Sequence, residues 1–207
     1  LREHPAIRLA SDNDWMPIES INERDEFQGI AADYIRLIQK RLGTKFQTSP
    51  VKPWAGILEM VEKRELDLFT AAMETDARKT YATFTKPYIS HPMVIITTDK
   101  VDYVDGLKGL YGKKIAIPKG YAINDFIIDD NPNLDIVLFD DLTSTLMAVL
   151  EGKAYACIVN LVTASHTMRT QGITNLKVSG DVPYRYELSL GVRNDWPELV
   201  LILQKAL

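Results

Sequence analysis

Two spacings of hydrophobic residues alternate along the chain, and each is typical of one kind of secondary structure. Short apolar runs such as Val94 to Thr98 are rich in β-branched residues and predict buried strands. Between these runs, apolar residues recur every three or four positions, which predicts amphipathic helices. The first helix is expected to end at Gly43, and its apolar stripe is Ile30, Tyr34, Leu37, Ile38 and Leu42.

The same patterns predict elements along the rest of the chain. Strands are expected at 6–10, 66–72, 94–98, 114–118, 136–139, 155–159, 175–179 and 187–192. Helices are expected at 54–61, 121–129, 142–150 and 196–207, with a short one ending near Gly172. Ser11 to Pro17 is predicted to be a polar loop. Strands that alternate with helices in this way favour an α/β fold.

Composition limits the classes to which the protein can belong. Its 207 residues suffice for one large domain or two lobes of about a hundred residues each. No apolar run approaches the roughly 20 residues of a membrane helix. The formal charge of -4, with scattered lysines and arginines, makes nucleic acid an unsuitable partner.

Cysteine content and the first residues bear on the compartment. Cys157 is the only cysteine, so neither an intrachain disulfide nor a cysteine-based zinc site is expected. Its apolar neighbours predict a place in the core. A cysteine-poor chain suits either the cytoplasm or the periplasm. Residues 1–5 lack the apolar stretch of an export signal, so any such signal is expected to have been removed or left out.

The most informative residue is Arg78, which follows the end of the predicted strand 66–72. That strand ends in small and hydroxyl residues and opens into a polar loop, and α/β proteins bind ligands at such ends. A guanidinium offers a planar fork of donors that matches a carboxylate. The alternative is that Arg78 is a solvated residue on a helical turn.

Several motifs, in their order and spacing, extend this interpretation over nearly the whole chain. They are Asp12 to Ser20, Phe27 to Tyr34, Glu74 to Arg78 with Phe84 to Tyr88, Pro118 to Ala122, and Asn160. Together they resemble the type II periplasmic solute-binding proteins, bilobed Venus-flytrap domains of the kind that bind amino acids. The segments Tyr184 to Ser189 and Val192 to Leu199 are most similar to flytrap modules of membrane-bound sensor histidine kinases. A solute-binding subunit of an ABC transporter is the alternative within the binding class.

The resemblance implies a two-lobed α/β fold in which each lobe is a mixed sheet flanked by helices. Lobe 1 would comprise residues 1–93 and 185–207, lobe 2 would comprise 94–184, and two hinge strands would join them. Closure over a small carboxylate-bearing solute would be the output, because only a ligand that prefers the closed state can shift its population. The implied location is extracytoplasmic, as part of an inner-membrane protein, with a dimer of the full-length sensor as an option.

The resemblance also implies ligand-binding residues in the first lobe. Arg78 would grip the ligand carboxylate, while Thr70 and Ala71 would offer a hydroxyl and backbone groups. Met73 stands where many amino-acid binders have a small hydroxyl residue, which predicts a more apolar pocket. Trp15 would form an aromatic wall, or alternatively pack into the lobe. Asp12, beside it, is a weaker candidate because aspartates are common in turns.

In the second lobe, Gly120 precedes a predicted helix start, where free backbone N–H groups favour an anion. Lys119 and Tyr121 stand beside it, and Lys119 either reaches a second acidic group or is solvated. Asn160 departs from the pattern of α-amino-acid binders, in which an aspartate usually pairs with the ligand ammonium. An amide supplies no countercharge, so the expected ligand is a carboxylate whose amino group is absent or secondary.

An enzyme is the alternative from another class, since some relatives of this fold are dehydratases. The sequence offers little for it. His4, His91 and His166 are isolated, and no metal-ligand spacing or nucleophile motif occurs. The expectation is therefore a domain without catalytic residues, metal or cofactor.

Overall fold

The computed structural model describes residues 6–12, 14–49 and 54–207, so His4 lies outside the described residues. The chain divides into two compact units. Unit 1 comprises the residues up to Ser90 and Glu187–Leu207, and unit 2 comprises His91–Tyr186. The chain passes between them in two strands, β8 (Ile89–Thr98) and β12 (Leu176–Arg193). Two units built of alternating strands and helices agree with the two-lobed α/β class expected from the sequence.

Unit 1 contains a mixed sheet with the strand order β5-β1-β6-β12. Its strands are β1 (Ile7–Ala10), β5 (Phe46–Thr48) and β6 (Leu68–Ala72), with β7 (Ala82–Phe84) pairing with β12. Strand β1 is parallel to β5 and β6, whereas β12 is antiparallel to β6. Every residue of β6 is buried, which explains the continuous run of apolar and small residues that predicted it.

Four helices belong to unit 1: α1 (Ile30–Leu42), α2 (Trp54–Glu62), α3 (Asp76–Lys79) and α7 (Pro197–Ala206). Gly43 caps α1 at φ 62°, a left-handed conformation that favours glycine, as predicted. The predicted apolar stripe of α1 is only partly correct, because Leu37 is 54% exposed while Ile35 is buried. The core forms where α1 and α7 pack on the sheet through Ile35 and Leu199.

A small sheet in unit 1 replaces the loop predicted at Ser11 to Pro17. It consists of β2 (Asp14–Trp15), β3 (Glu19–Ile21) and β4 (Phe27–Gln28), paired in the order β2-β3-β4. Within the predicted loop only Asp14 and Trp15 are in a strand, and β2 to β4 were missed because strands of two or three residues are too short for a readable alternation. Gly29 follows β4 at φ 105°, and a Cβ there would lie 2.6 Å from the Ile18 carbonyl oxygen. Only glycine therefore allows α1 to begin so close to β3.

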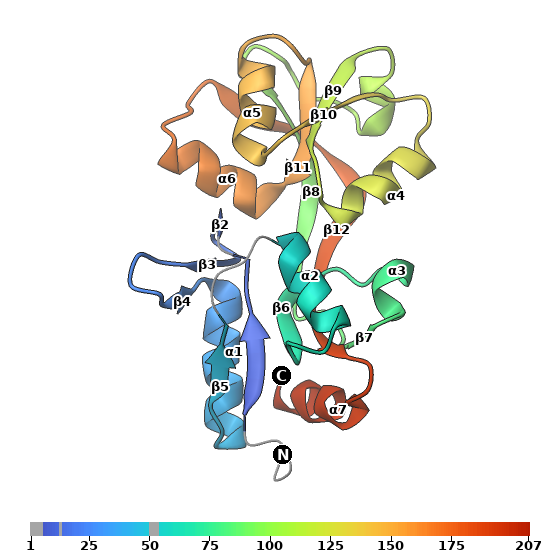
Figure 1. Cartoon of the computed structure of the whole chain (residues 1–207). Helices are drawn as coiled ribbons and strands as arrows, with labels where there is room; N and C mark the ends of the chain where they lie inside the picture. The colour runs from blue at the N-terminus through green and yellow to red at the C-terminus, as the bar shows by residue number, and fades with distance from the viewer. Residues whose placement is uncertain (1–5, 13, 50–53) are drawn as a thin grey trace. The chain divides into compact units, whose positions relative to one another are not determined.

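Unit 2 contains the strands in the order β10-β9-β11-β8-β12. The new strands are β9 (Lys114–Pro118), β10 (Asp135–Phe139) and β11 (Ala156–Asn160). Strand β9 is parallel to β10 and β11, and β8 is antiparallel to β11. The helices are the 3-10 turn η1 (Leu107–Leu110), α4 (Ala122–Asp130), α5 (Leu142–Leu150) and α6 (Leu161–Thr170). Figure 1 shows α4, α5 and α6 flanking these strands.

Two sequence predictions for unit 2 have clear outcomes. Cys157 is fully buried in the core, as predicted, and its burial raises the pKa of the thiol to about 12. The two strands predicted at 175–179 and 187–192 are instead one strand of 18 residues, β12. Gly180, Asp181 and Pro183 looked like a break in sequence, but the chain stays extended because neighbouring strands pair with it.

Candidate functional site

Arg78 lies on α3, a single helical turn after β6, as the alternative interpretation expected. Its side chain is nevertheless held in place. Nη1 donates to the Met73 carbonyl at 2.7 Å, and Cζ lies 5.3 Å from the centroid of the Trp54 ring, within cation–π range. The backbone N–H of Arg78 donates to the side chain of Thr75 at 3.3 Å. These contacts fix the position of the half-buried guanidinium on unit 1.

Part of this guanidinium remains available for another group. Its Nε and Nη2 atoms have no hydrogen-bond partner within the ranges that the structure describes. A guanidinium that is oriented by one carbonyl and one ring, and still has two donor atoms left, is suited to a bidentate contact with a carboxylate. Met73 orients the guanidinium through its backbone carbonyl, so this contact does not depend on the Met73 side chain.

Glu19 on β3 is a buried carboxyl group at the centre of a second cluster in unit 1. Its side chain is fully buried, Oε1 accepts the Asp12 N–H at 2.8 Å, and Oε2 accepts the hydroxyl of Thr70. Burial raises the pKa of Glu19 to about 8, against the opposing effect of the two hydrogen bonds. The carboxyl group is therefore largely protonated at neutral pH.

Tyr88 closes this cluster from the other side of Thr70. Its hydroxyl donates to the Thr70 carbonyl at 2.6 Å, and its ring meets Tyr34 edge-on with centroids 4.8 Å apart. Burial raises the pKa of Tyr88 well above its usual value. Both polar groups of Thr70 thus have partners inside unit 1, and the hydroxyl expected to face a ligand is bound to Glu19.

The remaining predicted residues of unit 1 fall near this cluster. Trp15 lies on β2 directly opposite Glu19 in the antiparallel pair, and Asp12 is joined to Glu19 through its backbone. Ala71 is 1% exposed within β6. Thr70, Asp12 and Trp15 are therefore gathered around Glu19, whereas Arg78 and Met73 form a separate group beyond the end of β6.

In unit 2, Asn160 is the last residue of β11 and the N-cap of α6. Its Oδ1 atom accepts the backbone N–H groups of Val162 at 3.0 Å and Thr163 at 3.2 Å. Asparagine is among the preferred N-cap residues for this reason. The Nδ2 atom of the same side chain is buried and has no partner among the described residues. The Oδ1 atom is thus used in capping α6.

The segment after β9 contains the other predicted residues of unit 2. Gly120 has φ +81° and nothing within 4 Å of an added Cβ, so it serves as an open left-handed turn. Tyr121 is the N-cap position of α4, and its ring contacts that of Tyr186 edge-on at 6.1 Å. Lys119 forms an exposed 2.7 Å ion pair with Asp140 rather than reaching into the protein. Such surface pairs contribute little to stability.

Parallel pairing places these two segments at one edge of the sheet of unit 2. Ala156 of β11 lies beside Ile115 of β9, so Asn160 and Lys119, each four residues further on, leave the sheet at the same edge. Asn124, on the first turn of α4, donates through Nδ2 to the Pro118 carbonyl. Its Oδ1 atom is buried without a partner in the described chain.

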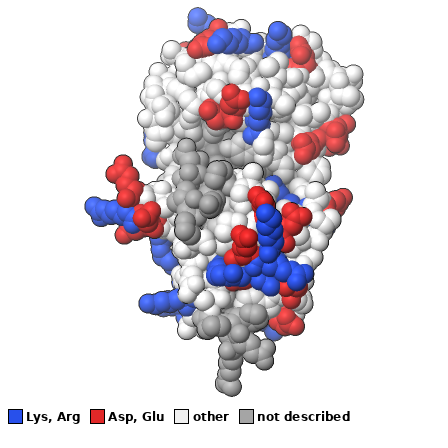
Figure 2. Space-filling model, in the orientation of Figure 1, with Lys and Arg blue, Asp and Glu red and all other residues white. Residues whose placement is uncertain are grey.

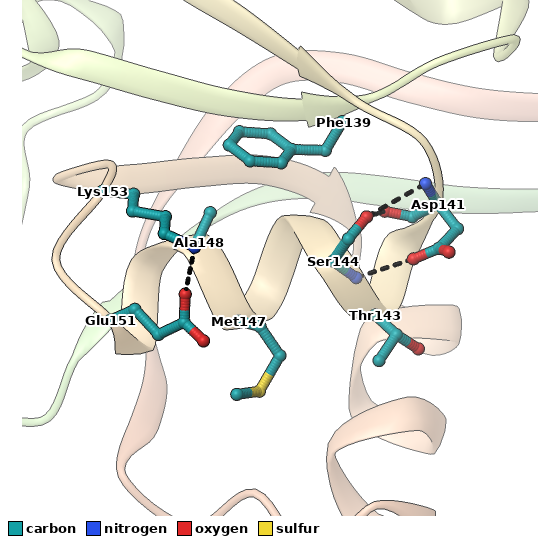
Figure 3. Close-up of a pocket in the computed structure, with 8 residues that line it drawn as sticks. All are labelled: Phe139, Asp141, Thr143, Ser144, Met147, Ala148, Glu151 and Lys153. Carbon is teal, nitrogen blue, oxygen red and sulfur yellow. Dashed lines mark hydrogen bonds and ion pairs between the residues drawn. The ribbon is translucent and has the colours of Figure 1, made fainter.

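A pocket of about 380 Å³ lies elsewhere in unit 2, along α5 (Figure 3). Its lining residues are Phe139, Asp141, Thr143, Ser144, Met147, Ala148, Glu151 and Lys153. Asp141 and Ser144 satisfy each other as a capping box, and Lys153 pairs with Glu151 at 2.6 Å. The polar groups of this pocket thus serve helix α5, and it includes none of the residues singled out from the sequence.

Charge and metal-ligating residues add no second site in the described ranges. Figure 2 shows acidic and basic side chains interspersed on the face in view. Within residues 6–12, 14–49 and 54–207, no cluster of three His, Cys, Asp or Glu side chains is placed to hold a metal ion. In the same ranges, no helix is long and apolar enough to cross a membrane.

The sequence analysis gave Trp54 and Asn124 no role in a site and included Glu19 only within the Asp12 to Ser20 motif. Trp54 was assigned only to a helix stripe, although its ring supports Arg78. Glu19 was one of 28 acidic residues, and only the unpredicted strand β3 buries it. Asn124 lay within a predicted helix with no signal of its own.

Comparison with known proteins identifies similar chains. Residues 7–207 match the family described as bacterial extracellular solute-binding proteins, family 3. The whole chain is 25% identical over 209 residues to the virulence sensor protein BvgS of Bordetella pertussis, and spans 17% of that protein's length. It is 20% identical over 209 residues to the L-cystine-binding protein TcyJ of Escherichia coli, covering 78% of it.

Solved structures show the same fold. The periplasmic VFT2 domain of Bordetella pertussis BvgS superposes with a TM-score of 0.88 at 24% identity, covering 99% of this chain and 88% of that one. A histidine kinase sensor domain with similarity to periplasmic binding proteins gives 0.86 at 19% identity, covering 100% and 90%. At these identities the similarity establishes the fold alone.

Proposed function

We propose a function from the premise that this chain belongs to the bacterial extracellular solute-binding proteins, family 3: it is an extracytoplasmic sensor domain that binds a small carboxylate-bearing solute. Arg78 would hold the carboxylate. The domain's proposed role is binding rather than catalysis. Lobe 1 is formed by residues 1–93 and 185–207, and lobe 2 by residues 94–184. Ligand binding would favour the closed arrangement of these two lobes.

The observation that carries this proposal is the state of the Arg78 guanidinium. It is oriented by the Met73 carbonyl and the Trp54 ring, yet two of its nitrogen atoms lack partners in the described chain. A fixed cation with unused donors lowers the ordering cost of binding an anion.

A thermal-shift experiment with a panel of small carboxylic acids tests this role. Ligand-induced stabilisation follows RT ln(1 + [L]/Kd), about 2.7 kcal/mol at a hundredfold excess over Kd, and Arg78→Ala should remove most of it. Arg36→Ala is the matched control, because Arg36 forms only exposed contacts with Asp33 and the Phe27 carbonyl. An equal shift in both variants would refute the assignment of Arg78.

We further propose that the domain is the input module of a membrane-anchored sensor histidine kinase, located in the periplasm. Similarity to BvgS, at 25% identity, exceeds that to TcyJ, at 20%. The chain spans only 17% of BvgS, so the kinase role concerns the parent protein. A kinase domain in the same reading frame would support this role, whereas a neighbouring ABC permease gene with no such domain would favour the transport alternative.

A further inference from the structure

We infer that the open edge of strand β10 and the pocket along α5 together bind an extended segment of a partner protein. The segment would join the sheet of unit 2 as a further strand, with an apolar middle and a basic residue at each end. This surface lies wholly within unit 2. It goes beyond the proposed function, because it does not involve the solute that Arg78 would hold.

Strand β10 has a neighbour on one side only. It pairs in parallel with β9 and is the outermost strand of its sheet among the described residues. The outer side of such a strand presents backbone N–H and C=O groups that can pair with another chain. Leu138, near the end of β10, is 47% exposed. This edge is therefore accessible.

The backbone of Leu138 faces the open side. The Phe139 carbonyl accepts the Lys119 N–H at 2.7 Å, so the backbone of Phe139 faces β9. Because successive residues of a strand point their backbone groups to opposite sides, those of Leu138 point away from β9. The N–H of Ile136, two residues earlier, agrees with this alternation, since it donates to the Leu134 carbonyl instead of to β9.

The sequence of β10 does not protect this edge. Edge strands are commonly protected by a lysine, a proline or a β-bulge. Residues Ile136 to Phe139 are all apolar. The ladder is regular as well, with Asp135 to Phe139 paired one to one with Lys114 to Pro118. Such a strand is suited to pairing with a further strand.

The pocket of about 380 Å³ borders the end of the same strand. Phe139 of β10 lines it together with Met147 and Ala148 of α5 (Figure 3). When a peptide joins a sheet edge, its backbone bonds give affinity and pockets for alternate side chains give specificity. A methionine side chain adapts readily to the shape of an apolar group. The pocket would therefore receive an apolar side chain of the added strand.

Acidic residues at both ends of β10 determine the charge of the partner. Asp135 begins the strand, Asp141 follows it, and both are exposed. Neither forms an ion pair within residues 54–207, although Lys114 lies beside Asp135 in the ladder. Six residues separate them, roughly 20 Å of extended chain. Lysine or arginine at both ends of a seven-residue segment matches this spacing, whereas a second copy of β10 would bring further acidic groups to the edge.

NMR titration of the ¹⁵N-labelled protein with synthetic peptides tests the inference. The probe is acetylated and amidated Lys-Val-Thr-Val-Thr-Val-Lys, and the comparison peptide has glutamate in place of both lysines. The basic peptide should shift the signals of β10 and α5 and bind about tenfold or more tightly than the acidic one. Absence of binding, signal shifts confined to other elements, or equal binding of both peptides would overturn the inference.

Two variants at one position test the backbone contact. Leu138→Pro removes the outward N–H without removing a bond to β9, and proline is tolerated at such edge positions. It should weaken the basic peptide about tenfold, as expected for one backbone hydrogen bond. Leu138→Val keeps the N–H and an apolar side chain, so its affinity should stay within about twofold of wild type. Equal affinities of the two variants would contradict strand addition.

The acidic ends are tested by Asp135→Asn combined with Asp141→Asn. Asparagine also caps helices, so α5 keeps its N-cap residue type. The double variant should lose most of the preference for the basic peptide over the acidic one. A preference equal to that of wild type would show that these carboxylates do not select the partner.

Methylated peptides give a test that needs no variant of the protein. The basic peptide is N-methylated either at its valines or at its threonines, and only one of the two forms should lose binding. The reason is that a single edge of an added strand faces β10. Equal effects of both forms would refute strand addition. Sedimentation of the protein alone provides the last check, because a dimer that Leu138→Pro abolishes would make a second copy the occupant and overturn the inference.

Discussion

The polar groups of the two units are satisfied to different degrees. In unit 1, Glu19, Thr70 and Tyr88 bond to one another or to backbone groups. In unit 2, Asn160 and Asn124 each bond through one amide atom and leave the other buried without a partner in the described chain. The Glu19, Thr70 and Tyr88 network of unit 1 is thus closed, whereas each of these two asparagines of unit 2 has one amide atom without a partner in the described chain.

This difference indicates how each unit would contribute to binding. A closed network is rigid, and it holds β6, which leads to Arg78, in one position. Unsatisfied buried atoms cost free energy in the unliganded protein, and a ligand that pairs with them recovers it. Under the proposed function, unit 1 would therefore present Arg78 in a preformed position.

The largest effect is expected from Glu19→Gln, which removes the titrating group of the unit 1 network. The folded-state pKa of about 8 lies above the unfolded value of 4.5, so the folded protein binds the extra proton between these values. The stabilisation that protonated Glu19 gives the folded protein is fully present below pH 4.5. It is lost as the pH rises to 8, by about 1.4 kcal/mol of unfolding free energy per pH unit.

Urea unfolding of both proteins from pH 5 to 8 measures this effect. The stability of wild type relative to Glu19→Gln should fall steadily over that range, by several kcal/mol in total. Glu23→Gln is the control, since it removes an exposed carboxylate from the turn that precedes β4. If the difference in unfolding free energy between wild type and Glu19→Gln did not change with pH, Glu19 could not be buried and protonated as described.

A smaller loss is expected from Tyr88→Phe, which removes one buried hydrogen bond from the same network. The variant keeps the ring that packs on Tyr34 but loses the donor to the Thr70 carbonyl. The free energy of unfolding should fall by about 1–2 kcal/mol. Tyr103→Phe serves as the control because Tyr103 is 71% exposed, and an equal loss in both would mean that the network of unit 1 contributes nothing.

The smallest effect is expected from Asn124→Ala in unit 2. The variant loses the bond to the Pro118 carbonyl, but it also removes an unpaired buried oxygen and gains helix propensity. The free energy of unfolding should change by no more than about 0.5 kcal/mol. Asn131→Ala is the contrast, because Nδ2 of Asn131 donates to both the Ile127 carbonyl and the Tyr184 hydroxyl. Its loss should lower the free energy of unfolding by about 1 kcal/mol. A larger loss in Asn124→Ala than in Asn131→Ala would contradict the assignment of the Asn124 Oδ1 atom as unpaired in unit 2.

Much of the fold was readable from the sequence because buried strands and amphipathic helices have their own periodicities. Strand β9 and helix α5 were predicted at the residues where they occur. The short strands β2 to β4 were missed, since they exist only by pairing with each other. The long strand β12 was divided in two for the same reason, because its neighbours stabilise a segment whose own residues favour a turn.

The sequence alone determined the fold class and the family, and it predicted that Arg78 binds a carboxylate. Only the tertiary structure decided which polar atoms are already used. Whether Thr70 faces a ligand or Glu19, and whether Asn160 accepts or donates, depends on groups distant in sequence or on the local helix geometry. A residue type sets which hydrogen bonds are possible, but burial and the position of neighbouring groups decide which of them are made.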